Sequence, residues 1–373
     1  MKFKRLLLAG AALIAFAACV YDGGGYGVAQ NAPQVQPLSH MEAVTVGAGT
    51  QWELDGMLHI PLGASAQSPV PAVVIVSGSG ASNMDGLIPG TMHPIHPYLD
   101  IARHLADNGI AVIRHDKSVY THGETMLAHY GGAFSLYEEY ITHVLSATEI
   151  LRNDPRVDAD RVFILGHSLG GMVAHRIHYE GGNFAGLILM GATPNSLVDA
   201  AIWQIEDQLA SFVEMVDAGV ITPDMPEYAI FQAQLAEFTA LIEFTRTVQA
   251  QIGEMTAEQA KEVPIPLLGA SAFYYWDMVN NPMSRFVGLT DAPVFVMQGE
   301  RDFQVTLLHD FPMMQEIFEN APNATLRVFE GLNHMFAQSN ATNHLEHATE
   351  IMTTPMSVDI SALQAIVEWI SQN

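Results

Sequence analysis

The sequence predicts an α/β fold in which a mostly parallel central sheet is flanked by helices. Short aliphatic runs, such as residues 72–76, alternate along the chain with longer stretches that have helical spacing. Strands that are apolar throughout are typical of a parallel sheet covered on both faces. Chemically distinctive residues follow several of these runs, and ligands of such sheets bind at the carboxyl ends of the strands.

The individual elements follow from the spacing of the apolar residues. Residues 42–46 and 52–60 predict a hairpin-like pair ahead of the main sheet. Further strands are expected at residues 72–76, 110–113, 162–165, 187–190, 294–297 and 326–329. Helices are expected at residues 98–108, 134–153, from 169 to about 179, and 360–370.

The alternation of strands and helices stops between residues 192 and 283. This stretch is helical in pattern, acidic and rich in methionine, and no strand signal precedes residue 294. We therefore expect a helical cap at 192–283, inserted into an α/β core of residues 39–191 and 284–373. An aromatic run at residues 273–276, with the candidate binding residues Tyr274, Tyr275 and Trp276, would either line an apolar pocket or seat the cap on the core.

The N-terminus is typical of an exported bacterial protein. Its basic start precedes a short apolar run at residues 6–18, which has the build of a signal peptide. Within the signal peptide predicted at residues 1–19, Ala17-Ala18-Cys19 resembles a lipoprotein cleavage site, so cleavage before Cys19 would leave it as a lipidated N-terminus that anchors the protein to a membrane. Ordinary signal cleavage near Ala17 is the alternative. Residues 20–38 are expected to form a flexible tether.

The charge balance and the spacing of the histidines argue against two classes of function. The chain carries 40 acidic and 15 basic residues, a formal net charge of -25. A nucleic-acid-binding protein needs a basic face, and no Lys/Arg cluster follows the first five residues. The histidines between residues 93 and 143 match no zinc-binding spacing, so no metal site is expected.

Residues 166–170, with the sequence GHSLG, fit the pattern G-x-S-x-G. They follow the expected strand at 162–165 and open an apolar helix, which is the context in which this pattern forms a tight turn that presents a nucleophilic serine. The N-terminus of the helix then points free N–H groups toward the reacting oxygen. Ser168 is therefore the candidate nucleophile, and a glycine-rich turn with an incidental serine is the alternative.

An acid and a base are expected after the last two strands. Asp302 follows the strand at 294–297, and His334 follows the strand at 326–329. With Ser168 they stand in the chain order Ser, Asp, His that catalytic triads on such sheets have. Glu300 and Asp291 are competing acids. In this hypothesis His334 takes the serine proton and Asp302 orients the imidazole.

An oxyanion formed at the serine needs N–H donors. One is expected from Leu169, the residue after the nucleophile, and the other from Ser79 in the glycine-rich segment 77–80. His93 and His96 lie in a proline-rich stretch close to that segment in the sequence. We therefore include both histidines as candidate substrate-binding residues.

Taken together, the chain from about residue 40 to its end resembles bacterial esterases of the α/β-hydrolase superfamily related to dienelactone hydrolases and acyl-thioester hydrolases. The similar segments are residues 77–86, 109–117, 298–305 and 331–334. Residues 83–86, NMDG, depart from the Asp-Arg-Asp-Gly usual in that group. The resemblance implies an α/β-hydrolase fold, a small-molecule acyl ester as substrate, and hydrolysis through an acyl-enzyme without metal or organic cofactor. It also assigns acid and base roles to Asp302 and His334.

Two other functions remain open from the sequence. A serine peptidase of the prolyl-oligopeptidase type has the same triad order, although the long N-terminal propeller of that type is not among the expected elements. A non-catalytic binding protein on a hydrolase scaffold is the second alternative. Such a protein is expected to have lost a triad residue or the glycines of the turn, and this sequence retains all of them.

Overall fold

The structure is a computed structural model, and it describes residues 39–87, 92–93, 95–219, 221–263 and 271–373. The signal peptide predicted at 1–19, its Cys19 and the tether at 20–38 lie outside the described residues. No helix within the described ranges is both long enough and apolar enough to cross a membrane.

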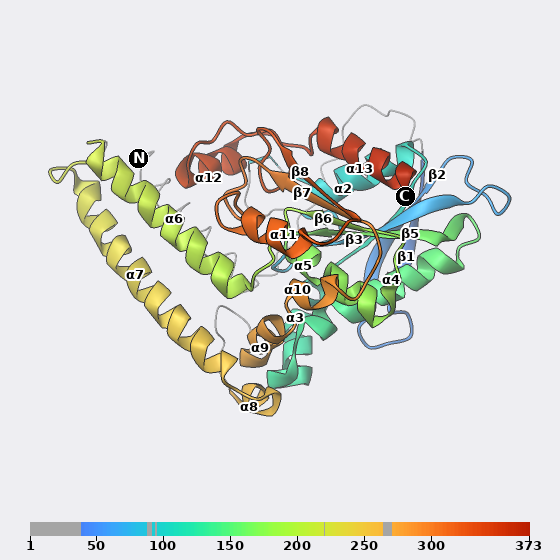
Figure 1. Cartoon of the computed structure of the whole chain (residues 1–373), viewed down its shortest axis with the longest axis horizontal. Coiled ribbons are helices and arrows are strands. Elements are labelled where there is room, and N and C mark those ends of the chain that lie inside the picture. Colours follow the sequence, from blue (N-terminus) through green and yellow to red (C-terminus); the bar gives the residue numbers. More distant parts are fainter. Residues whose placement is uncertain (1–38, 88–91, 94, 220, 264–270) are drawn as a thin grey trace.

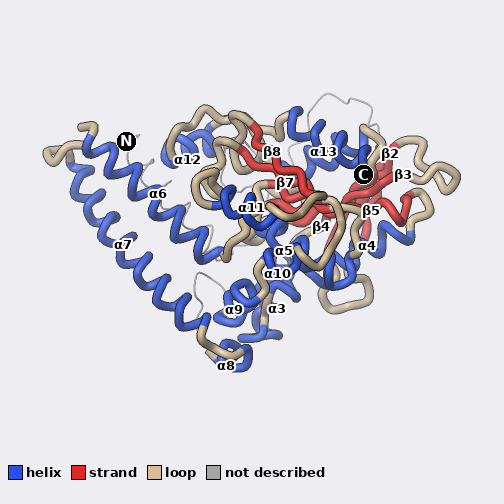
Figure 2. The backbone as a smooth tube through the Cα atoms, viewed as in Figure 1, coloured by secondary structure: helices blue, strands red, loops and turns tan. Residues whose placement is uncertain are grey.

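In the described part of the chain, one eight-stranded sheet has the order β1-β2-β4-β3-β5-β6-β7-β8. Strands β1 and β2 form an antiparallel pair, β2 is antiparallel to β4, and all other neighbours are parallel. This arrangement, with helices on both faces, confirms the predicted fold class (Figures 1 and 2). The strands are β1 Ser39–Val46, β2 Leu54–Pro61, β3 Val70–Val76, β4 Ala111–His115, β5 Val157–His167, β6 Leu187–Met190, β7 Val294–Gly299 and β8 Ala324–Phe329.

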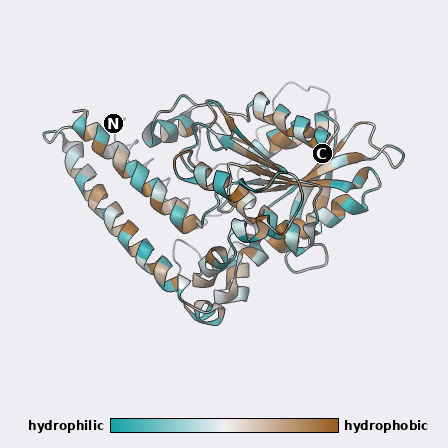
Figure 3. Cartoon of the chain, in the orientation of Figure 1, coloured by the Kyte–Doolittle hydropathy of each residue, from teal (hydrophilic) through white to brown (hydrophobic). Residues whose placement is uncertain are grey.

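The two faces of the sheet have separate apolar cores. Because side chains alternate along a strand, Val73 and Ile75 belong to a cluster with α2 and α13, while Val74 and Val76 belong to a cluster with α3, α4, α5 and α11. Apolar residues are concentrated in the central strands (Figure 3). The helices are α2 Pro97–Asp107, α3 Ser118–Tyr130, α4 Thr142–Asn153, α5 Leu169–Ile177, α11 Asp310–Phe318, α12 His344–Thr353 and α13 Ile360–Gln372.

One expected helix differs from the prediction. In place of a single helix over residues 134–153, the π-helical turn η2 Tyr137–Ile141 precedes α4. Within this turn, the Glu138 carboxylate accepts two hydrogen bonds from Ser135, which precedes the turn. The backbone N–H of Ser135 donates at 2.9 Å and its hydroxyl donates at 2.6 Å. The π turn carries the buried residues Glu139 and Tyr140. Both contact the site described below.

Between β6 and β7 the chain forms the helices α6 Leu197–Asp217, α7 Pro226–Gly253, α8 Ala257–Glu262, α9 Ala272–Asn280 and α10 Met283–Val287, called the inserted helices here. Helices α6 and α7 diverge from the turn that joins them and extend away from the sheet (Figure 1). They have an apolar cluster of their own, which includes Ile202, Phe238 and Tyr275 from α6, α7 and α9. The inserted helices therefore pack partly against one another.

Candidate active site

Ser168 occupies the tight turn between β5 and α5. Its backbone has φ 54 and ψ -121, a conformation that non-glycine residues seldom adopt and that is found at functional turns. The Ser168 N–H donates to the carbonyl of Met190 at 2.9 Å. This is the strand-turn-helix context that the G-x-S-x-G pattern predicts.

The glycines around Ser168 are required by close backbone contacts. A Cβ on Gly166 would lie 2.4 Å from the carbonyl oxygen of Gly170, and one on Gly170 would lie 2.3 Å from that of Val76. A Cβ on Gly78 would lie 3.1 Å from the Cβ of Ser168. The segment after β3 therefore lies directly beside the candidate nucleophile.

Asp302 and His334 contact each other from the loops after β7 and β8. The Nδ1 atom of His334 lies 2.8 Å from Oδ2 of Asp302, and both side chains are buried. The other carboxylate oxygen of Asp302 accepts the backbone N–H groups of Gln304 at 2.8 Å and Val305 at 2.9 Å. A carboxylate held in this way orients the imidazole with its proton on Nδ1, which leaves Nε2 as an acceptor.

The competing acids lie elsewhere. The Glu300 carboxylate accepts the backbone N–H of Gly331 at 2.9 Å, and Asp291 precedes β7, so it lies at the opposite end of that strand from Asp302. Asp302 is thus the candidate acid whose carboxylate meets His334.

His167 connects the Ser168 turn to the loop of His334. Its Nε2 lies 2.9 Å from the carbonyl oxygen of His334, and the two rings are 4.7 Å apart between centroids. Because a carbonyl accepts, Nε2 of His167 carries the proton, and Nδ1 then accepts from the Tyr98 hydroxyl at 3.0 Å. Burial, with the neighbouring His334, lowers the pKa of His167 to about 3, so this ring is neutral in ordinary buffers.

The Tyr98 oxygen in turn accepts the backbone N–H of Gly78 at 2.9 Å. A buried chain of hydrogen bonds therefore runs from Gly78 through Tyr98 and His167 to the carbonyl of His334. Sequence reasoning did not single out Tyr98 or assign a role to His167. The signal was weak, because His167 fills a variable position of G-x-S-x-G and its partners are remote in the sequence.

Gly78 and Gly80 flank Ser79 and are held through their carbonyl oxygens. Lys117 Nζ donates to Gly78 O at 2.8 Å and to Gly80 O at 2.9 Å, and the hydroxyl of Tyr140 donates to Gly78 O at 2.7 Å. Leu169 is the first residue of α5, where an N–H has no acceptor within the helix. These are the two segments from which the oxyanion donors Ser79 and Leu169 are expected.

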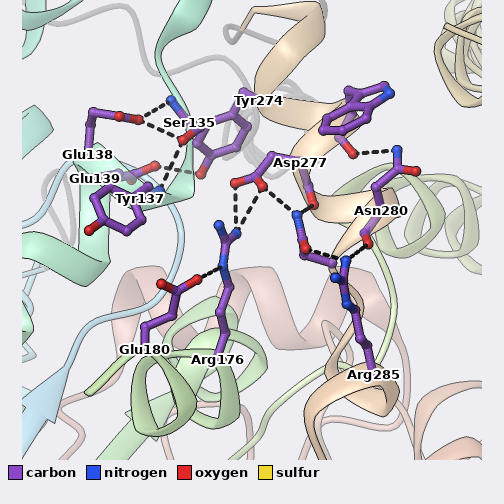
Figure 4. Close-up of polar contacts among 12 residues, drawn as sticks. Ser135, Tyr137, Glu138, Glu139, Arg176, Glu180, Tyr274, Asp277, Asn280 and Arg285 are labelled. Atoms are coloured by element: carbon purple, nitrogen blue, oxygen red, sulfur yellow. Dashed lines mark hydrogen bonds and ion pairs between the residues drawn. The ribbon is translucent and has the colours of Figure 1, made fainter. Parts of the chain in front are cut away.

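The aromatic run of α9 makes structural contacts. The Tyr274 hydroxyl donates to Glu139 at 2.5 Å, from α9 to the core (Figure 4), and its ring stacks on Phe134. Tyr275 packs in the cluster of the inserted helices, and the indole N–H of Trp276 donates to the carbonyl of Met255 at 2.9 Å. Tyr274 therefore seats α9 on the core, while Tyr275 and Trp276 make these contacts within the inserted segment.

The two candidate histidines differ in exposure. His93 is exposed, and His96 is the half-buried N-cap of α2. Among the described residues, no group of three or more His, Cys, Asp or Glu side chains is placed to hold a metal ion.

The model of the Alpha/beta hydrolase family matches residues 73–343, which is more than half of the chain. The chain belongs to the alpha/beta hydrolase family. This alpha/beta hydrolase is similar to Esterase EstD of Thermotoga maritima, with 27% identity over 284 residues, which cover 76% of the chain but only 58% of EstD.

Two solved structures are similar to this chain at low sequence identity. Est1E from Butyrivibrio proteoclasticus is 15% identical, with a TM-score of 0.49 over 89% of this chain and 99% of that chain. A puromycin-hydrolyzing peptidase of Mycobacterium tuberculosis is 14% identical, with a TM-score of 0.50 over 92% of this chain and 41% of that chain.

Proposed function

We propose that this alpha/beta hydrolase is a serine esterase that cleaves a carboxylic ester or thioester. The observation that carries the proposal is the 2.8 Å contact of His334 with Asp302, in loops joined by His167 to the strained turn of Ser168. The similarity to an esterase, EstD, supports the same reaction class.

The proposed reaction proceeds through an acyl-enzyme. Ser168 Oγ attacks the acyl carbon while Nε2 of His334 takes its proton, and Asp302 stabilises the imidazolium that forms. The tetrahedral oxyanion is bound by the N–H groups of Leu169 and Ser79. Collapse of this intermediate transfers the proton to the leaving alcohol or thiol and leaves Ser168 acylated. A water molecule, activated by His334, then releases the acid.

The test is hydrolysis of p-nitrophenyl esters of graded acyl length by the wild type and Ser168→Ala. Turnover should disappear in Ser168→Ala and persist in the matched variant Ser371→Ala, which changes an exposed serine of the last helix. The best acyl length then measures the acyl site. Retained turnover in Ser168→Ala would refute the proposal. If the wild type cleaves no ester but a fluorophosphonate labels Ser168, a peptidase becomes the better assignment.

The N-terminal sequence supports export to the cell envelope as a further part of the proposal. Lipid attachment at Cys19 would move the expressed protein to the membrane fraction, and Cys19→Ala would release it. If the wild type and Cys19→Ala divide equally between the membrane and soluble fractions, ordinary signal cleavage is the better explanation.

A further inference from the structure

Lys117 is a buried cation with no role in the chemistry described so far. It stands between β4 and α3, and its side chain is 2% exposed. Its Nζ lies 2.5–2.9 Å from oxygens of Gly78, Gly80, Tyr140 and Glu139. Since the Tyr140 hydroxyl donates to Gly78 O, both side chains hold the same carbonyl.

Among the residues that the structure describes, one carboxylate pairs with this buried charge. Burial lowers the pKa of Lys117, and the Glu139 carboxylate at 2.6 Å opposes that shift. The second oxygen of Glu139 accepts from the Tyr274 hydroxyl. Buried ion pairs add little to stability compared with apolar side chains of similar volume. Stability alone therefore does not explain why Lys117 and Glu139 are buried. The carbonyl groups of Gly78 and Gly80, which Lys117 binds, suggest a role for the pair.

Those carbonyls fix the direction of the neighbouring N–H group. In a trans peptide the C=O of Gly78 and the N–H of Ser79 belong to one plane and point in opposite directions, and the described residues contain no cis peptide bond. Lys117 and Tyr140 hold the oxygen on one side, so the Ser79 N–H points to the other. The N–H of Gly78 is already engaged by Tyr98. In this segment the N–H of Ser79, and not that of Gly78, is therefore the candidate donor to the oxyanion.

We propose that Lys117 is a positioning residue for the oxyanion-binding peptide of Ser79, acting through the carbonyls of Gly78 and Gly80. The assignment rests on the proposed function and adds a residue to it. The ammonium also polarises the peptide group, because a charge-assisted hydrogen bond on the C=O strengthens the N–H as a donor. Lys117 thus acts on the transition state without touching the substrate.

The test compares Lys117→Met with Lys261→Met, which changes the exposed lysine of α8. We expect Lys117→Met to lower kcat on p-nitrophenyl acetate by up to about 10²-fold, the effect of losing one oxyanion donor, with KM within about twofold. Lys261→Met should match the wild type. If Lys117→Met does not fold, Lys117→Met/Glu139→Gln removes both buried charges and provides the same comparison.

A second readout separates positioning from a purely structural role. Paired oxo- and thionoesters of one acid differ in the atom that accepts the hydrogen bonds, and sulfur is a weak acceptor. Loss of an aligned donor should reduce the preference of the enzyme for the oxoester. A wild-type rate, or a lower rate with the wild-type preference, would overturn the assignment. If turnover also survives in Ser168→Ala, the proposed function itself fails. If Ser168→Ala is inactive, only the role of Lys117 is lost.

Discussion

Arg176, on the helix that begins directly after Ser168, is joined to Asp277 of α9 (Figure 4). Its Nη1 lies 2.9 Å from both carboxylate oxygens, and both residues are buried. Asp277 also accepts from the side-chain amide of Asn281 at 2.7 Å. The helix that supports the candidate nucleophile is thereby tied to the inserted helices.

Asp277→Ala should lower the free energy of unfolding by about 3–5 kcal/mol, because it removes the carboxylate that binds Nη1 of the buried Arg176 guanidinium. Urea unfolding followed by fluorescence measures the change. Glu180→Gln is the control, since Glu180 meets Arg176 at 3.4 Å from a more exposed position and should cost under about 1 kcal/mol. Arg176→Met/Asp277→Leu should be milder than Asp277→Ala. Equal midpoints for Asp277→Ala and Glu180→Gln would contradict this prediction.

The proposed mechanism predicts that kcat/KM falls at acid pH. Only a neutral imidazole accepts the proton of Ser168, so activity should be lost when the catalytic base is protonated at acid pH. His167 stays neutral at mildly acid pH, because burial lowers its pKa to about 3. The acid limb therefore reports on His334. A profile that stays flat between about pH 8 and pH 5 would count against His334 as the base.

The parts of the site that the sequence predicted are local. Ser168, Asp302 and His334 each follow a strand, and an apolar run followed by a distinctive residue is visible without knowledge of the packing. The contacts that support them are remote: Tyr98 meets Gly78 across 20 residues, and Lys117 meets it across 39. Such pairs depend on strand order and register. The π-helical turn Tyr137–Ile141 was not predicted from the sequence, because a turn of five residues barely changes the helical spacing of the apolar side chains.

Gly170→Ala should disrupt the turn of Ser168. The added Cβ would lie 2.3 Å from Val76 O and 2.6 Å from Ser77 O, and neither backbone atom belongs to a flexible side chain that can move aside. We expect a lower melting temperature and loss of activity. Gly253→Ala is the control, since a Cβ in that part of α7 meets nothing within 4 Å. Gly253 is the last residue of α7, so alanine there should change the stability by less than about 1 kcal/mol. Equal melting temperatures for the two variants would refute the role given to Gly170.

Tyr98→Phe tests the hydrogen-bond chain from Gly78 to His334. The substitution keeps the ring but removes the hydroxyl that accepts from the Gly78 N–H and donates to Nδ1 of His167. Leaving a buried polar group unpaired costs about 1–3 kcal/mol, so the variant should unfold at lower urea. It should also show a reduced kcat, because Gly78 supplies the carbonyl of the peptide whose N–H is proposed to bind the oxyanion.

The matched control for Tyr98→Phe is Tyr179→Phe, since the Tyr179 side chain is 58% exposed and its loss of a hydroxyl should change neither value. A double-mutant cycle of Tyr98→Phe with His167→Leu then measures the coupling between the two side chains. Additive effects would mean that Tyr98 and His167 act independently. A large coupling energy would show that the oxyanion segment and the His334 loop are held by one network, so that a change at either end alters the geometry at both.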